Sequence, residues 1–237
     1  MASIYTGTSG FAYASWRPAF YPDKLPASRF LEHYATRLNA VESNYTFRRL
    51  VSEKVLDGWM KVSPAGFLFA VKAHQRITHI KRLKDPQEFL PAFLNTLNPL
   101  RAAGRLGPVL FQIPPNLKRD DELLATFLGE LPQGLRCVLE VRHASWFEEP
   151  VMDLLRRFNV ALCRAESEKL VAPDVPTADF VYFRLRKADY SPAERVELAA
   201  QAKEHLAAGR DVFAIFKHED DPAGALYAEE LRVACGG

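Results

Sequence analysis

Two glutamates and a lysine occupy positions from which they could carry acid–base chemistry. Glu42, Lys72 and Glu140 each lie within or at the end of a short apolar segment, where a charged side chain is out of place without a partner or a ligand. Two carboxyl groups that face each other can act as general acid and general base, as in glycoside hydrolases. These three residues are therefore the candidate catalytic residues. The alternative is that each glutamate pairs with a neighbouring base, such as Lys72 or Arg142.

Lys72 has two chemical options. A lysine with a lowered pKa can form a Schiff base or supply a proton. Two nearby glutamates favour the charged ammonium, so the pKa of Lys72 is expected to stay high and its role to be electrostatic.

Other polar and aromatic residues near the expected strand ends form a candidate substrate-binding set. Its members are Thr8, Trp16, Asn44, His79, Gln112, Arg142, His143, Trp146, Arg184, Arg186 and Lys217. The basic members suit a phosphate or carboxylate, because guanidinium groups bind such anions through two parallel hydrogen bonds. The aromatic members could stack on a sugar or a base, or could only anchor their loops. Arg184→Ala is expected to weaken anion binding with little change in the fold.

The histidines offer a weaker case for a metal. His79, His143 and His218 follow expected strands and could join the glutamates as ligands, but the chain has no HxH or HExxH spacing. A P-loop and a GxGxxG motif are also lacking. The sequence therefore predicts neither a metal site nor a cofactor.

The elements that would position these residues alternate along the chain. Short apolar runs predict strands at 4–8, 40–44, 67–72, 108–113, 136–141, 160–164, 180–185 and 211–216. Helical periodicity predicts helices at 28–38, 52–61, 86–100, 121–131, 150–158, 192–208 and 222–233, with Asp85 and Ser191 among the expected caps. The helix between 166 and 179 is expected to be short or missing.

Eight alternations without a Gly-rich phosphate loop favour a closed barrel over an open parallel sheet. The expected fold is α/β, a single closed (β/α)8 TIM-like barrel formed by one domain, residues 1–237. Barrel enzymes carry their sites at the carboxyl ends of the strands. Residues on one face of a strand alternate, so Glu42, Lys72, Gln112, Glu140 and Arg184 can all point into one mouth. The alternative is a closed salt-bridge layer that fills the barrel.

The composition and charge of the chain limit the classes of protein to which it can belong. The chain has 237 residues, of which 48% are hydrophobic and 25% charged, so it is expected to be globular and not disordered. A net charge of +2 does not by itself imply binding to nucleic acid or to a membrane. Three scattered cysteines, no apolar run of membrane-spanning length and no basic-then-apolar leader predict a cytoplasmic protein.

Five motifs, in order along almost the whole chain, resemble those of the bacterial YecE-like family, a domain of unknown function. They are 7–13 with Trp16, 41–44 with Thr46 and Phe47, 67–73 with Thr78 and His79, 110–115, and 140–143 with Ser145 and Trp146. The resemblance implies a TIM-like barrel and no assigned activity.

The chain also departs from the family pattern. The family often has Tyr and Pro where this chain has Arg48 and Val51. Many members have His-Gly where this chain has Arg186 and Lys187, and an Asn pair where it has 217–218. The departures imply a more basic site.

These observations predict an enzyme that acts by acid–base chemistry on a small anionic or phosphorylated molecule at the carboxyl-terminal mouth of the barrel. The reaction class stays open among hydrolase, lyase and isomerase. One alternative is a nucleic-acid-associated protein or phosphodiesterase, which is less favoured. The other is a non-catalytic sensor that binds a ligand in the same pocket. No membrane partner is expected, and the sequence leaves the oligomeric state open.

Overall fold

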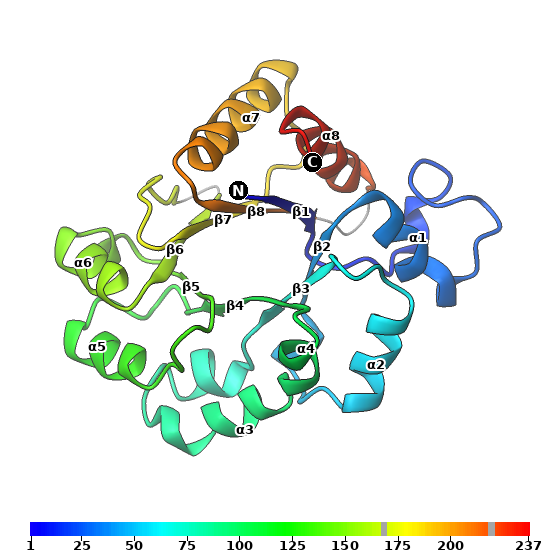
Figure 1. Cartoon of the computed structure of the whole chain (residues 1–237). Helices are drawn as coiled ribbons and strands as arrows, with labels where there is room; N and C mark the ends of the chain where they lie inside the picture. The colour runs from blue at the N-terminus through cyan, green and yellow to red at the C-terminus, as the bar shows by residue number, and fades with distance from the viewer. Residues whose placement is uncertain (167–169, 218–220) are drawn as a thin grey trace.

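Eight parallel strands form a nearly closed ring at the centre of the protein (Figure 1). The computed structural model describes residues 1–166, 170–217 and 221–237. The strands are β1 (Ile4–Thr8), β2 (Ala40–Ser43), β3 (Leu68–Lys72), β4 (Leu106–Gln112), β5 (Cys137–Glu140), β6 (Val160–Ala165), β7 (Phe180–Leu185) and β8 (Asp211–Phe216). They are ordered β1-β8-β7-β6-β5-β4-β3-β2. The predicted α/β TIM-like barrel is confirmed.

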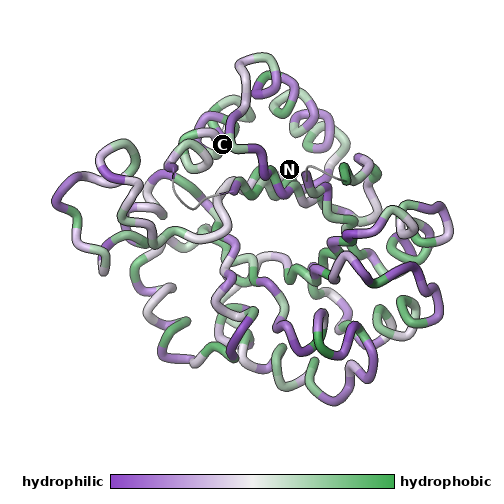
Figure 2. Tube along the Cα trace, turned by 180° about the vertical axis from the view of Figure 1, so that it is seen from behind, coloured by the Kyte–Doolittle hydropathy of each residue, from purple (hydrophilic) through white to green (hydrophobic). Residues whose placement is uncertain are grey.

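Helices surround the ring on its outside (Figure 1). They are α1 (Phe30–Arg37), α2 (Glu53–Lys61), α3 (Leu90–Asn95), α4 (Asn98–Ala102), α5 (Asp121–Gly129), α6 (Glu149–Arg157), α7 (Pro192–Ala207) and α8 (Ala223–Ala234). Seen from behind, hydrophobic and hydrophilic residues alternate along these helices, as one buried face requires (Figure 2). Residue 166 and residues 170–179, between β6 and β7, form no helix, as predicted. No helix of the described chain is both long and apolar enough to cross a bilayer.

The prediction of one helix over 86–100 is wrong. The segment is divided into a 3-10 turn (Pro86–Glu88), α3 and α4. Pro91 and Pro99 each stand in the first turn of a new helix, where a missing N–H costs nothing. Inside a longer helix each would remove a hydrogen bond. Asp85 has a left-handed backbone (φ 48°) and no side-chain cap bond, so its predicted capping role is also wrong.

Side chains join β1 to β2, where the sheet order begins and ends. Within the described chain, backbone ladders connect the other neighbouring strands. Asn39, just before β2, forms side-chain hydrogen bonds to the backbone of β1 in place of backbone hydrogen bonds between the two strands. Its Oδ1 accepts from the Thr6 N–H at 2.8 Å, and its Nδ2 donates to the Ile4 carbonyl at 2.8 Å.

Tyr34 of α1 makes a second bridge across the same seam. Its hydroxyl accepts from the Thr8 N–H at 2.8 Å and donates to the Ala40 carbonyl at 3.0 Å. Gly7 is required nearby, because a Cβ there would lie 2.0 Å from the Ala40 carbonyl oxygen. The barrel is therefore completed by one asparagine, one tyrosine and a close approach that only glycine allows.

Two apolar clusters hold the barrel together. The larger one lies between the strands and the outer helices. The smaller one fills the inside of the ring and includes Ala70, Leu110, Val138, Tyr182 and Phe213. On β3, β4, β5 and β7 the next side chains on the same face are polar, and they form the base of the mouth: Lys72, Gln112, Glu140 and Arg184.

Candidate functional site

An arginine and two glutamates form a buried layer across the barrel. Arg184 on β7 donates from Nη2 to Oε1 of Glu42 at 2.6 Å and from Nε to Oε2 at 3.0 Å. Its Nη1 donates to Oε2 of Glu140 at 2.5 Å. The side chain of Arg184 is 2% exposed and those of both glutamates are 0% exposed. One guanidinium thus joins strands from three parts of the ring.

Three further side chains complete the hydrogen bonding of the two carboxylates. Gln112 donates to Oε1 of Glu140 at 2.8 Å, and Nε of Arg142 donates to the same oxygen at 2.5 Å. The Tyr182 hydroxyl donates to Oε2 of Glu42 at 2.8 Å. Every carboxylate oxygen in the layer therefore accepts at least one strong hydrogen bond.

The layer fixes the protonation states within it. Burial alone would raise the pKa of Glu140, but the charges of Arg184 and Arg142 outweigh burial and hold this pKa at about 2. Burial would lower the pKa of Arg184, yet the charges of Glu140 and Glu42 raise it well above its ordinary value. Glu140 is thus ionised and Arg184 charged at neutral pH.

This geometry matches the closed salt-bridge alternative more closely than an acid–base pair. Both carboxyl groups are inaccessible, and their oxygens are occupied by donors. A general acid or base must reach the proton it transfers. The catalytic role of Glu42 and Glu140 stays a prediction, and their visible role is to hold Arg184.

A cavity of about 360 Å³ lies above the layer. It is lined by Ser9, Asn44, Tyr45, Phe47, Arg48, Arg49, Lys72, Arg184 and Arg186. Five of these nine residues are basic, and no Asp or Glu of the described chain lines the cavity. The glutamates beneath neutralise Arg184 but leave the other four charges. A concave site lined by one sign of charge attracts the opposite sign.

Arg186, which lines this cavity, has an unsatisfied donor. Its Nε is buried and, within the described chain, has no hydrogen-bond partner. Burial, followed by the charge of Arg184, lowers the pKa of Arg186 from its usual value. A buried donor without an acceptor is costly, and the charge of Arg186 adds to the basic wall of the cavity.

Lys72 differs from the sequence-based expectation. Burial, followed by the charge of Arg184, lowers its pKa to about 8, although Glu42 and Glu140 act in the opposite direction. The expectation of a high pKa is therefore wrong, because burial and the charge of Arg184 together outweigh the two carboxylates. The Lys72 ammonium lies 4.2 Å from the ring centre of Phe47, and no described residue offers it a carboxylate.

The loop after β2 supplies residues that the sequence reasoning did not select. Thr46 donates to the Lys72 carbonyl at 2.6 Å and so fixes the 3-10 turn Tyr45–Phe47 beside the end of β3. This turn presents Phe47, Arg48 and Arg49 to the cavity. Two features of the sequence could have indicated these residues. The segment directly follows a strand, and Arg48 stands where the family often has Tyr.

The remaining predicted residues fall into two groups. Asn44, Lys72, Arg184 and Arg186 line the cavity. Thr8, Trp16 and Trp146 are fully buried, so these three support the surrounding loops and do not line it. Thr8 binds the Gly10 carbonyl at 2.6 Å, and Trp146 binds the Leu117 carbonyl at 2.8 Å.

The histidines have local partners. Nδ1 of His143 lies 2.8 Å from the Ser145 hydroxyl, and Nδ1 of His79 lies 2.8 Å from that of Thr78. The ring of His79 also packs edge-on against Phe47 at 5.1 Å. His218 lies outside the described residues. Across residues 1–166, 170–217 and 221–237, no three His, Cys, Asp or Glu side chains group as metal ligands.

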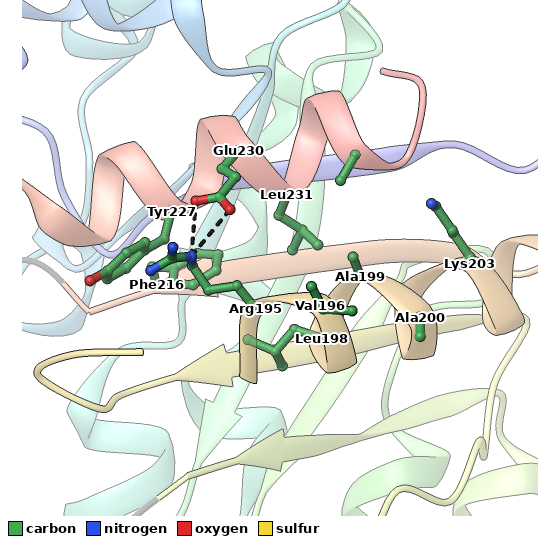
Figure 3. Close-up of a pocket in the computed structure, with 11 residues that line it drawn as sticks. Arg195, Val196, Leu198, Ala199, Ala200, Lys203, Phe216, Tyr227, Glu230 and Leu231 are labelled. Atoms are coloured by element: carbon green, nitrogen blue, oxygen red, sulfur yellow. Dashed lines mark hydrogen bonds and ion pairs between the residues drawn. The ribbon is translucent and has the colours of Figure 1, made fainter. Parts of the chain in front are cut away.

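Two other hollows are less suited to an anion. One of about 630 Å³ is lined by Lys217 and Arg186 but also by Glu166, Glu194 and Glu197, so its charge is mixed. The other, of about 320 Å³, lies between the outer helices α7 and α8 (Figure 3). Apolar side chains line most of it, and the 3.1 Å ion pair of Arg195 and Glu230 crosses it.

The whole-chain comparison decides the family. The family described as "Protein of unknown function DUF72" matches residues 5–236. The chain belongs to this family. The DUF72 assignment agrees with the YecE-like resemblance of the motifs. The description of the family names no activity.

Named relatives agree with this assignment. The UPF0759 protein YunF of Bacillus subtilis is 31% identical over 153 residues, which are 62% of this chain and 53% of that protein. The UPF0759 protein YecE of Escherichia coli is 32% identical over 118 residues, 49% of this chain and 43% of that protein. The matched stretches thus span about half of these relatives.

Solved structures of the family share the barrel. A DUF72 family protein from Thermotoga maritima superposes with a TM-score of 0.86 at 26% identity, over 99% of this chain and 100% of that chain. Another, from Enterococcus faecalis, gives 0.80 at 18% identity, over 100% of this chain and 99% of that chain. The second likeness concerns the fold alone.

Proposed function

We propose that this DUF72 protein is an enzyme whose mouth cavity binds a small molecule bearing a phosphate or carboxylate group. The observation that carries the proposal is the basic cavity wall, in which five of the nine lining residues are basic. The buried glutamates orient Arg184 from below, and Lys72 is the accessible acid–base group. Its lowered pKa, about 8, suits proton transfer near neutral pH.

Anion binding is tested by calorimetric titration with inorganic phosphate and with phosphorylated metabolites at constant ionic strength. Arg186→Gln keeps a polar side chain that can form hydrogen bonds but removes its charge. Loss of one charge-assisted hydrogen bond costs about 1.5–3 kcal/mol, so affinity should fall roughly tenfold to a hundredfold. The matched control is Lys61→Gln, which changes an exposed base at the end of α2 that does not line the cavity.

The alternatives give different results. Equal losses in Arg186→Gln and Lys61→Gln, or binding of neutral and cationic compounds only, would contradict the anion site. Binding without turnover, unaffected by Lys72→Met, would favour a sensor. Binding that requires an oligonucleotide would favour a nucleic-acid role.

A further inference from the structure

The Lys72 amine has the surroundings of a nucleophile. It lines the cavity, lies against the face of Phe47, and has no hydrogen bond or ion pair with the described residues. A lysine that is largely removed from solvent normally pairs with a carboxylate, and the two candidates, Glu42 and Glu140, are bound to Arg184 instead. A desolvated amine beside other cations is a recognised way to activate a lysine.

We propose that Lys72 forms an imine with a carbonyl group of an anionic substrate, so that the substrate class is an oxo acid or a phosphorylated carbonyl compound. This inference rests on the proposed function, because the same cavity must first bind the anion. The bases Arg186, Arg48 and Arg49 share the cavity with Lys72. A substrate held by its anionic group would thus present its other end to the amine.

The step is balanced without any redox partner. The neutral amine attacks the carbonyl carbon, the C–N bond forms, and the carbonyl oxygen takes a proton. The nitrogen then releases both of its protons: one replaces the proton that the oxygen took up, and the other joins the hydroxyl group, which leaves as water. The net reaction is condensation of one primary amine and one carbonyl compound to one imine and one water. Burial and the neighbouring charge of Arg184 supply the neutral amine by lowering the pKa of Lys72.

Reductive trapping tests the proposal on the intact protein. The probes are pyruvate and glyoxylate, with acetone as a neutral carbonyl, each in the presence of sodium cyanoborohydride at pH 7. Intact mass and peptide mapping then locate the secondary amine. We expect the adduct from pyruvate or glyoxylate at Lys72, formed at least about tenfold faster than at Lys61, whose side chain is exposed. Added phosphate should slow the reaction at Lys72 and not at Lys61.

Lys72→Arg should abolish the trapped adduct, and Lys61→Arg should leave it unchanged. Peptide mapping of the wild type keeps the test valid even if Lys72→Arg does not fold. Label spread evenly over surface lysines, or equal trapping of acetone, would overturn the inference. Phosphate binding without a Lys72 adduct would reject the imine and leave the proposed function standing. If the wild-type protein does not bind phosphate at all, both the imine and the proposed function are rejected.

Discussion

Arg184 contacts both carboxylate oxygens of Glu42 across the barrel, at 2.6 Å to Oε1 and 3.0 Å to Oε2. The pair is almost completely buried. Its remaining terminal nitrogen, Nη1, binds Glu140. A buried arginine between two glutamates is stable only while all three charges are present, because each charge lost leaves an unpaired one behind.

Arg184→Met should therefore destabilise the protein by about 3–5 kcal/mol, since two buried carboxylates lose their partner. This reverses the expectation from sequence that Arg184→Ala leaves the fold unchanged. The measurement is the free energy of unfolding in urea. The triple variant with Glu42→Gln and Glu140→Gln should regain much of the loss. A single variant as stable as the wild type would contradict the role of this layer.

The pattern of the barrel could be read from the sequence because strand parity and alternation are local properties. The positions of Glu42, Gln112, Glu140 and Arg184 on one face follow from a period of two. Their pairing does not follow, because it depends on which strands lie opposite in the ring. Strand parity thus predicts that the two glutamates point into the same mouth. It does not show that Arg184 forms hydrogen bonds with both of them.

The pKa of Lys72 was missed for the same reason. Counting nearby glutamates predicts a charged lysine, whereas burial and the charge of Arg184 outweigh Glu42 and Glu140 and lower the pKa. The seam residues Asn39 and Tyr34 also carry no sequence signal of their own. They act between segments that meet only when the ring closes.

Acid should weaken the layer through Glu140. Its pKa is about 2 in the folded protein, below the ordinary value of 4.5, so the unfolded chain binds the proton more readily. The stabilisation is complete above pH 4.5 and is lost as the pH falls toward 2. We expect about 1–3 kcal/mol of unfolding free energy to depend on this group.

The measurement is urea unfolding between pH 6 and pH 2.5. Glu140→Gln should show a flatter pH dependence than the wild type. Glu130→Gln, which changes an exposed residue at the end of α5, should retain the wild-type slope. Identical slopes for all three proteins would show that Glu140 is not the acid-sensitive group.

Tyr34→Phe tests the seam between β1 and β2. The change removes the hydroxyl that links Thr8 to Ala40 and leaves a buried N–H and a buried carbonyl without this partner. The expected loss is about 1–3 kcal/mol of unfolding free energy. Tyr5→Phe is the matched control, because no hydrogen bond joins the Tyr5 hydroxyl to the described chain. Equal effects would mean that the Tyr34 hydroxyl does not help to close the barrel.

Lys72→Met should stabilise the protein at pH 7. Burial and Arg184 disfavour the ammonium, so the folded pKa of about 8 lies below the ordinary 10.5. The unfolded chain then holds the proton more tightly, and the folded state carries the full penalty below pH 8. We expect a gain of about 1–3 kcal/mol on substitution.

The penalty should disappear as the pH rises from 8 to 10.5. Over that window the stability of the wild type should approach that of Lys72→Met, although the charges of Arg184, Arg186, Glu42 and Glu140 stay in place around it. Thermal unfolding of both proteins at pH 7, 9 and 10.5 gives the comparison. A destabilised Lys72→Met at pH 7 would show that the ammonium holds the fold together.

Arg48 and Arg186 both line the cavity, and both stand where the sequence departs from the YecE-like pattern. Restoring the common residues should therefore weaken phosphate binding. Arg186→His should have the larger effect, about tenfold or more, because Arg186 is half-buried and solvent screens its charge less. Arg48→Tyr should cost less, because Arg48 is exposed and solvent screens its charge.

Salt separates the two contributions. Between 20 mM and 300 mM sodium chloride the Debye length falls from about 20 Å to about 6 Å, which screens an exposed charge but hardly a buried one. The deficit of Arg48→Tyr relative to the wild type should therefore shrink with salt, whereas that of Arg186→His should persist. Calorimetric titration of phosphate into the three proteins at both salt concentrations measures this, with Lys61→Gln as the control for general surface charge. If both deficits vanish at 300 mM, Arg186 attracts anions only at long range and does not bind them directly.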